Sequence, residues 1–284
     1  MSTIPESVTP EQFEQYILPH LTTAKRGYVS KTPLMGIFNL ILYRLHTGCQ
    51  WDCLPVSKDA AEREARNEPS WQAVYDHWSA WSADGSLERV WQHSLVSIQA
   101  DLDLRQLNMD GSHAIAKKGG ESVAYQARKR AKTSNILPIT DRHGNIVAST
   151  GIVAGNHNDA FNLKAHLQAA FKAIKRLGLV IAGAFFNADS AFDTKEARKV
   201  CFNHHVMPNM AENKRNRKYI KRGRKRFFDA TVYTIRFVSE RTFAWIDKFR
   251  ALLVRFDLKD ANFLAGHHLA FALINLRHLF AGKV

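Results

Sequence analysis

An almost unbroken apolar run at residues 180–186 limits the folds open to this chain more than any other feature of its sequence. The run, VIAGAFF, contains no polar or charged side chain. Apolar residues on both faces are typical of a strand in a parallel sheet that helices cover on both sides. Residues 163–177 and 193–204 flank the run and have helical spacing. The run therefore predicts a central parallel strand in an α/β domain.

Further strands and helices are predicted around this strand. Residues 107–110 alternate as a strand does, and residues 136–140 and 146–153 have the pattern of a β-hairpin. Helical spacing returns at 229–256 and 259–280. We therefore predict that residues 104–284 form a mixed β-sheet flanked by helices.

The first 103 residues carry helical patterns and are predicted to form a separate N-terminal helical domain. We expect helices over 34–45, 70–82 and 87–100, with a surface connection over 58–69. Thr32-Pro33 is a typical helix start and Gly48 a typical helix end. The second helix has two interpretations, which stand side by side: it reads DNA as part of a helix-turn-helix, or its aromatic side chains pack in the core.

The composition favours a polyanionic partner. The 284 residues contain 40 Lys and Arg against 26 Asp and Glu, a formal net charge of +14. Such a surplus suits phosphate groups, although charge alone does not reject a basic protein without that partner. The three cysteines include no CxxC pair, and no apolar run is long enough to cross a bilayer. We expect a cytoplasmic protein with no disulfide framework, zinc site or membrane segment.

Two acids follow predicted strands at the edge where α/β sheets place their sites. Asp110 ends or nearly ends the first strand, and Asp189 follows the apolar run. If these two strands pair, their carboxylates converge beyond the carboxyl ends of the strands. For either acid taken singly, capping of a turn is the better explanation.

A third acid lies on a predicted helix that is apolar over much of its surface. Tyr233, Arg236 and Glu240 have i, i+3 and i+7 spacing and so share one face of a continuous helix. A glutamate on such a helix needs a partner. A metal ion shared with Asp110 and Asp189 is one solution, and an ion pair with Arg236 is another. Spacing alone favours the ion pair.

Several segments carry motifs in a fixed order. They are LYRLHTGCQWDCLP (42–55), SWQAVYDHWSAW (70–81), DGSHAIAKKGG (110–120), GNHND (155–159), NADSAFDTKE (187–196) and YTIRFVSERTFAWIDKFRALLVRF (233–256). In order, spacing and surrounding chemistry they resemble insertion-sequence transposases of the IS-five group. The resemblance covers roughly residues 20–280. It implies a ribonuclease H-like catalytic core with an Asp-Asp-Glu metal triad.

The resemblance assigns the three acids. Asp110, Asp189 and Glu240 match the family's catalytic residues and metal ligands, and Tyr233 and Arg236 match its signature around the glutamate and are expected to contact DNA. The resemblance implies Mg²⁺ as cofactor, with Mn²⁺ able to replace it. Mg²⁺ prefers carboxylate oxygens, and two ions on three carboxylates suit an in-line phosphoryl displacement.

One position departs from the family pattern. A lysine is expected seven residues after Glu240, but Asp247 stands there and Lys248 follows. Lys248 is rotated roughly 80° from the face of Glu240 on a continuous helix. Either Lys248 or Arg250 is then expected to make the phosphate contact.

The resemblance implies an enzyme that transposes an insertion sequence. It would cleave double-stranded DNA at the terminal inverted repeats and transfer the strands into target DNA. It would act as a homodimer or higher multimer on DNA in the bacterial cytoplasm, associated with the nucleoid when DNA-bound. The alternatives are a transposase-derived DNA-binding protein that no longer cuts, which Asp247 favours, and a related nuclease that cuts without joining.

Basic residues cluster near the predicted site. Residues 214–226 contain nine basic residues and no acid, and we expect a basic insertion at about 213–227 that contacts DNA, although most charge runs are only solvated surface. The predicted phosphate contacts are Lys214, Arg215, Arg217, Lys218, Lys221, Arg222 and Arg224. A second cluster comprises Lys117, Lys118 and residues 128–132.

Three further residues are expected to support the metal site: His113, His157 and Asp159. The alternative for His157 and Asp159 is an ordinary turn that leads into the next helix. For His113 the alternative is an ordinary position near the end of a strand.

Overall fold

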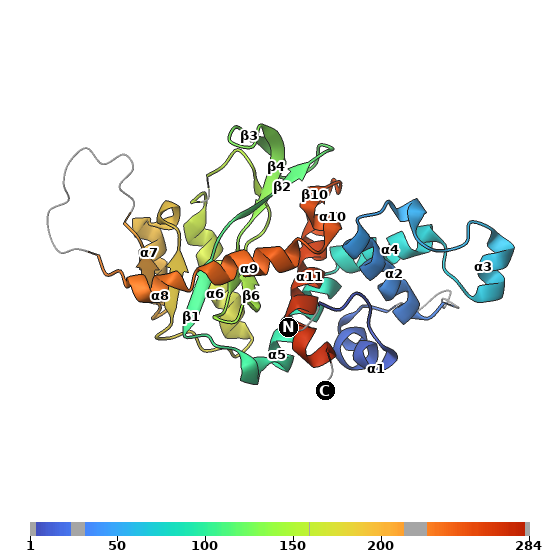
Figure 1. Ribbon diagram of the computed structural model, residues 1–284, viewed down its shortest axis with the longest axis horizontal. Helices are drawn as coiled ribbons and strands as arrows, with labels where there is room; N and C mark the ends of the chain where they lie inside the picture. Colours follow the sequence, from blue (N-terminus) through green and yellow to red (C-terminus); the bar gives the residue numbers. More distant parts are fainter. Residues whose placement is uncertain (1–3, 24–31, 159, 213–225, 282–284) are drawn as a thin grey trace. The chain divides into compact units, whose positions relative to one another are not determined.

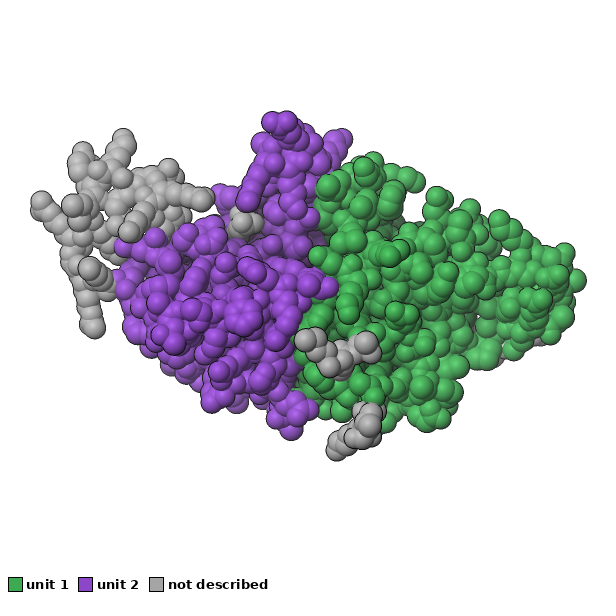
Figure 2. Space-filling model, in the orientation of Figure 1, with its two compact units in different colours: residues 1–98, 114–121, 245–284 green, residues 99–113, 122–244 purple. Residues whose placement is uncertain are grey.

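The computed structural model describes residues 4–23, 32–158, 160–212 and 226–281 (Figure 1). These residues form two compact units, which Figure 2 colours separately. Unit 1 is drawn from residues 1–98, 114–121 and 245–284, and unit 2 from residues 99–113 and 122–244. The sequence predicts one boundary near residue 103, whereas the structure groups the C-terminal segment with the N-terminal helices.

Unit 1 is a helical bundle. Its described α-helices of four residues or more are α2 (Leu34–Thr47), α3 (Ala60–Arg66), α4 (Trp71–Ala83), α5 (Ser86–Ser97), α10 (Arg250–Leu253) and α11 (Asp260–Phe280), and a π-helix spans Phe13–Ile17. Helix α2 ends as predicted at Gly48, whose φ of 71° suits glycine. Ser70 caps α4, its Oγ accepting a hydrogen bond from the Ala73 amide at 3.2 Å.

The segment 58–69, predicted to be a surface connection, instead contains helix α3. The carboxylate of Asp59 accepts hydrogen bonds from the amides of Ala61 and Glu62, at 2.8 and 2.9 Å. These bonds satisfy amides that have no partner inside the helix. A local cap therefore forms a helix where the apolar pattern shows none.

Helix α11 explains why the C-terminal segment belongs to unit 1. Residues 262–277 are buried around nearly the whole helix, and α11 packs against α4 and α5. A helix that is apolar on all sides must be covered on all sides. Trp91 of α5 stacks on His268, with ring centroids 5.0 Å apart. Burial of this helix therefore decides the domain grouping.

Unit 2 is built on a five-stranded mixed sheet. Its strands are β1 (Gln106–Met109), β5 (Pro138–Thr140), β6 (Ile146–Ser149), β8 (Phe185–Ala188) and β9 (Met207–Met210), and their order is β6-β5-β1-β8-β9. Strand β5 pairs antiparallel with β6 and β1, and β8 pairs parallel with β1 and β9. This order and these directions are those of the ribonuclease H-like fold, which confirms the predicted fold class.

The predicted central parallel strand is present, but it starts later than expected. Val180 is 75% exposed and Gly183 has a φ of 84°, so the first half of the apolar run is a turn. Strand β8 begins at Phe185 and continues through Asn187 and Ala188. Strand β9, which shows no clear alternation, was not predicted.

Helices α6 (Leu163–Arg176), α7 (Lys195–Asn203) and α8 (Ala230–Thr234) contact strands of this sheet. Helix α9 (Phe237–Ile246) contacts the β5–β6 turn, where Thr242 Oγ1 donates to the Gly144 carbonyl at 3.2 Å. Phe171 of α6 packs edge-on against Phe186 of β8, with centroids 5.6 Å apart. Helix α8 contacts β8 and β9. Side chains of alternate residues on β8 therefore reach different layers.

Short strands outside this sheet were also not predicted. They are β2 (Ser112–Ala116), β3 (Ala124–Gln126), β4 (Ala131–Ile136), β7 (Val153–Ala154) and β10 (Val254–Arg255). In unit 2, β4 pairs antiparallel with β3 and β7. In unit 1, β10 pairs parallel with the end of β2. Across the described ranges, no helix has the length and apolar character needed to cross a membrane.

Candidate active site

Asp110 and Asp189 lie side by side at one edge of the unit 2 sheet. Strands β1 and β8 are parallel neighbours, with Met109 opposite Ala188, and each acid is the next residue along its strand. The Asp110 carboxylate accepts a hydrogen bond from the Gly111 amide at 2.9 Å, and the Asp189 carboxylate accepts one from the Ser190 amide at 2.5 Å. Both acids therefore lie just beyond the carboxyl ends of parallel strands, where α/β sheets form their sites.

Asp110 lies near one like charge, Asp189, and one opposite charge, Arg236. Burial raises the pKa of Asp110, and the charge of Asp189 acts in the same direction, while the Gly111 amide and Arg236 oppose them. Arg236 Nη1 lies 2.7 Å from Asp110 Oδ2. The Asp110 side chain is only 28% exposed, so this ion pair is screened less than one on the surface. Arg236 thus belongs to the acidic site and does not pair with Glu240.

A buried ladder of asparagines lies beneath the two acids. Asn187 Nδ2 donates to Asn108 Oδ1 at 2.9 Å, and Asn209 Nδ2 donates to Asn187 Oδ1 at 2.8 Å. The three residues are in register on β1, β8 and β9 and are fully buried. Asn108 and Asn187 each precede an acid by two residues, so they share its face of the sheet. The ladder therefore pins the strand register that brings the acids together.

The ladder is connected at both ends to backbone that anchors helices. At one end, Asn209 Oδ1 accepts from the Asp229 amide at 2.8 Å, and the Asp229 carboxylate caps α8 through the Val232 amide at 3.1 Å. Helix α8 carries Tyr233, and Arg236 follows it. The ladder thus fixes the start of α8, the helix that leads to Tyr233 and Arg236 beside Asp110.

At the other end, Asn108 Nδ2 donates to the Asp141 carbonyl at 3.4 Å. The buried Asp141 carboxylate accepts from the amides of His143 and Asn145, both at 2.8 Å, and so fixes the β5–β6 turn. Burial raises the pKa of Asp141. The β5–β6 turn also contacts α9, because Arg241 Nη2 donates to the His143 carbonyl at 2.9 Å.

The continuous helix predicted over 229–256 is interrupted between α8 and α9. Amides of residues 235, 236, 238 and 239 donate to carbonyls three residues back, at 2.9 to 3.3 Å. This 3₁₀ pattern advances the chain by about 120° per residue instead of about 100°. Residues after the interruption are therefore rotated by roughly 80° from the face that an uninterrupted α-helix would give them.

Glu240 is consequently exposed, and it takes no part in the hydrogen bonds of Asp110 and Asp189. The buried positions of α9 are Val238, Ser239, Thr242 and Ile246. Glu240 makes no ion pair with any residue that the structure describes. Within those same residues no three His, Cys, Asp or Glu side chains are grouped closely enough to hold one metal ion. The structure thus brings together two of the three predicted acids.

The predicted supporting residues have structural contacts. His113 Nδ1 lies 3.3 Å from Thr133 Oγ1, and His157 stacks on Phe161 with centroids 3.6 Å apart. A Cβ on Gly155 would lie 2.7 Å from the Thr133 carbonyl oxygen, so the GNHND loop requires glycine for its close approach to β4. Asp159 lies outside the described residues.

The predicted DNA-binding residues fall into three groups. Tyr233 and Arg236 lie by Asp110, with the Arg236 guanidinium 5.6 Å from the Tyr233 ring centroid. Lys248 is exposed in unit 1. The predicted contacts from Lys214 to Arg224 lie outside the described residues.

A buried ion-pair cluster follows Asp189 and was missed in the sequence. Asp193, only 1% exposed, pairs with Arg198 Nε and Arg226 Nη1, each at 2.6 Å. The sequence suggested only a turn or helix start for Asp193. Arg226, the last residue of the basic segment, therefore has a structural role. Nothing in the local pattern marks it, because its partner lies more than thirty residues away.

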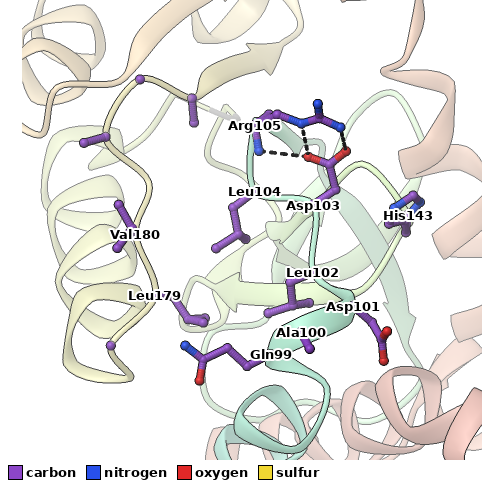
Figure 3. Close-up of a pocket in the computed structure, with 14 residues that line it drawn as sticks. Gln99, Ala100, Asp101, Leu102, Asp103, Leu104, Arg105, His143, Leu179 and Val180 are labelled. Atoms are coloured by element: carbon purple, nitrogen blue, oxygen red, sulfur yellow. Dashed lines mark hydrogen bonds and ion pairs between the residues drawn. The ribbon is translucent and has the colours of Figure 1, made fainter.

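Unit 2 also contains a cavity of about 710 Å³, shown in Figure 3. Residues 99–105, 178–180 and 182–184 line it together with His143, at the amino ends of β1 and β8. Asp103 and Arg105 form an ion pair of 2.7 Å there, and the hydrogen bond from Arg105 lowers the pKa of Asp103 to about 2. The cavity lies at the opposite strand ends from Asp110 and Asp189 and does not belong to their site.

The sheet order is that of a ribonuclease H-like protein, and the paired acids lie where such sheets form their sites. The family model "Transposase DDE domain" matches residues 101–276, and the model "Putative transposase of IS4/5 family (DUF4096)" matches residues 9–91. The first match spans more than half of the chain, so this protein belongs to the transposase DDE domain family. It is a DDE transposase, and domains of this family use divalent metal ions.

Two solved structures show remote similarity, each with 11% sequence identity over 96% of this chain. One is the Mos1 transposase paired-end complex with left transposon end, with a TM-score of 0.29 and 85% of that chain covered. The other is the Mos1 mariner paired end complex with Mn, with a TM-score of 0.27 and 86% covered. No curated protein matches the chain.

Proposed function

We propose that this transposase cleaves the ends of its own insertion sequence and joins them to target DNA, using Asp110, Asp189 and Glu240 as metal ligands. The observation that carries the proposal is the pairing of Asp110 and Asp189 beyond two adjacent parallel strands. The strands supply the two carboxylates from distant parts of the chain, and the asparagine ladder beneath them fixes their separation. The inferred partner is double-stranded DNA, both the terminal inverted repeats and the target.

The donor set suits Mg²⁺. Carboxylate oxygens are the ligands that this hard cation prefers, and Mn²⁺ accepts the same ligands. When bound, such ions activate an attacking hydroxyl and stabilise the leaving oxygen of an in-line displacement. Asp110 is already held by Arg236 Nη1 at 2.7 Å, so a cation on Asp110 Oδ2 would compete with this guanidinium. A released Arg236 would be free to contact a DNA phosphate.

Glu240 completes the proposed triad through a local rewinding. The 3₁₀ turns around Ile235 and Arg236 separate α8 from α9. Rewinding them as α-helix would return Glu240 to the helix face of Tyr233 and Arg236. The exchange keeps the backbone hydrogen-bonded, with partners four residues back in place of three, but turning α9 breaks the hydrogen bond from Arg241 to the His143 carbonyl. We propose that DNA and metal binding favour the rewound form.

The test compares three single variants with the wild type. Asp110→Asn, Asp189→Asn and Glu240→Gln keep the side-chain shapes but remove the charge that holds a metal. Each is expected to abolish strand cleavage, a loss of at least a hundredfold in rate, while DNA binding changes little. The measurement is cleavage and joining of labelled element ends in Mg²⁺, beside binding of the same DNA by gel shift.

Glu196→Gln is the matched control, because Glu196 is an exposed helical acid outside the proposed triad. Its cleavage rate should equal that of the wild type. Full cleavage by Glu240→Gln alone would remove Glu240 from the site and leave the aspartates. Binding without cleavage by the wild type would favour a transposase-derived DNA-binding protein, and cleavage without joining would indicate a nuclease.

We also propose that the active species is a homodimer or higher multimer on paired DNA ends, because cutting and joining two ends requires two catalytic sites. Light scattering of the protein with and without DNA ends measures this. A monomer that cuts and joins both ends would contradict it.

A further inference from the structure

Unit 1 contains a cavity that the transposition chemistry does not use. It measures about 740 Å³ and lies among the loop that follows α2, the start of α4, Lys118 and the loop before α11. All of its lining residues belong to unit 1. A cavity of this size suits a small organic ligand or a single nucleotide.

One wall of the cavity is aromatic. Trp51, Trp71 and Tyr75 all line it. The centroid of the Trp51 ring lies 5.4 Å from that of Tyr75, in an edge-on contact, and 5.9 Å from that of buried Trp78. Tyr75 remains 37% exposed. The wall therefore offers ring faces on which a planar group can stack.

Arg44 is a buried cation without an anion. It lines the cavity, is 9% exposed, and its guanidinium lies 4.5 Å from the Trp51 ring centroid. Its Nε is buried with no hydrogen-bond acceptor, and no described residue forms an ion pair with it. A cation–π contact leaves the N–H donors of the guanidinium unsatisfied, and an unpaired buried charge is costly. Arg44 thus indicates an anionic ligand inside the cavity.

The other charged side chains of the lining are of both signs. Lys118 and Lys259 add two cations to Arg44, and a guanidinium with lysines suits a phosphate. Asp52 and Asp257 also line the cavity and can accept hydrogen bonds from amino groups. A nucleotide whose base carries an amino group combines the anion, the planar ring and the N–H donors that this lining can bind.

We propose that this cavity binds one unpaired nucleotide of DNA, with its phosphate on Arg44 and Lys259 and its base stacked on Trp51 and Tyr75. The inference rests on the proposed DNA substrate. A base inside a duplex is stacked between its neighbours, so the nucleotide must leave the stack to reach the cavity. Stacking on aromatic side chains offsets part of the cost of unpairing. The cavity would thereby hold DNA in a distorted form during transposition.

The test compares two DNA duplexes that differ at one position. One carries a single unpaired 5-iodo-deoxycytidine, whose base has an amino group, and the other has the same residue fully paired. The wild-type protein is expected to bind the unpaired form about tenfold more tightly. Ultraviolet irradiation should crosslink the iodinated base to a peptide that contains Trp51, Trp71 or Tyr75. Equal affinity for both duplexes, or a crosslink only elsewhere in the chain, would overturn the inference.

Exposed positions supply variants that should still fold. Tyr75→Ala and Lys259→Gln are expected to remove most of the tenfold preference and leave binding of the paired duplex unchanged. The controls are Tyr43→Ala, at an exposed tyrosine of α2 that does not line the cavity, and Lys58→Gln. A preference that survives in Tyr75→Ala would count against the pocket.

The proposed function and the pocket fail in different ways. Loss of cleavage in the triad variants with an intact preference for the unpaired nucleotide leaves the pocket standing. Normal cleavage with equal affinity for the two duplexes leaves the transposase function standing and removes the pocket. If neither duplex binds, binding of free deoxycytidine monophosphate, measured by calorimetry, decides between an empty cavity and a nucleotide site.

Discussion

At the residue scale, three asparagine side chains link three neighbouring strands by hydrogen bonds. An amide side chain has both donors and an acceptor, so Asn108, Asn187 and Asn209 form a continuous chain of hydrogen bonds across three strands. The chain extends to the backbone of Asp141 and Asp229. Because every member is buried, each bond is costly to lose. The two aspartates of the site therefore stand on a rigid base.

Replacement of the middle asparagine tests this role. Asn187→Ala leaves Asn108 Oδ1 and an Asn209 N–H without partners in the core. We expect a loss of about 2–4 kcal/mol in the free energy of unfolding. Urea unfolding measures it, with Asn203→Ala on the exposed end of α7 as control. A change below about 0.5 kcal/mol would show that water or repacking replaces the ladder.

At the element scale, α11 places ionisable groups where water does not reach. His267 and His268 are buried among apolar neighbours. Burial lowers the pKa of His267 to about 4 and that of His268 to about 3. His267 Nδ1 lies 3.0 Å from the Phe263 carbonyl, and His268 stacks on Trp91. The neutral imidazoles therefore fit the core, whereas their charged forms do not.

A pH dependence of stability follows from these two histidines. Their pKa is near 6.5 in the unfolded chain and lower in the folded one, so between about pH 4 and 6.5 the unfolded chain binds more protons. The stabilisation is complete above pH 6.5 and falls by about 1.4 kcal/mol per pH unit per histidine below it. Unfolding free energies at pH 7 and pH 5 measure this.

His268→Phe should retain the stacking on Trp91 and reduce the pH slope by about 1.4 kcal/mol per pH unit, the share of one histidine. His205→Asn is the control, because His205 is exposed and asparagine tolerates its φ of 58°. An unchanged slope in His268→Phe would place the pH dependence elsewhere in the protein.

At the scale of the whole molecule, part of the positive charge surplus lies on the β3–β4 hairpin of unit 2. The β3–β4 hairpin carries exposed Arg128, Arg130 and Lys132, and its turn residue Arg130 has a φ of 51°. Lys129 is partly engaged, since its Nζ lies 3.2 Å from the His113 carbonyl. Exposed cations on a short hairpin are free to approach phosphates, and phosphate contacts make DNA binding depend on salt.

Neutralising this hairpin tests that role. The triple variant Arg128→Gln, Arg130→Gln, Lys132→Gln should bind DNA more weakly and lose roughly 0.9 in the salt slope for each phosphate contact removed. Titrations at several salt concentrations measure the slope. The control neutralises three exposed cations of α6, Lys172, Lys175 and Arg176. Equal slopes in the hairpin variant and the wild type would make the hairpin ordinary surface.

Local patterns determined a large part of this protein. Helices α2, α4 and α5, the β5–β6 hairpin and the parallel strand before Asp189 follow from caps, turns and apolar spacing. Those patterns depend on neighbours in sequence, so they can be read without a fold. The placement of Asp110 and Asp189 after strands belongs to the same category. Their pairing was conditional on the strand order.

Tertiary structure decided the rest. Burial of α11 on all sides joined the C-terminus to the N-terminal helices, and strand register aligned the asparagines. The 3₁₀ turns at Ile235 and Arg236 broke a helix that sequence spacing predicts as continuous and rotated Glu240 away from Arg236. Arg236 pairs instead with Asp110, 126 positions away in sequence. Such contacts depend on how distant segments pack, and a pattern among neighbouring residues cannot predict that packing.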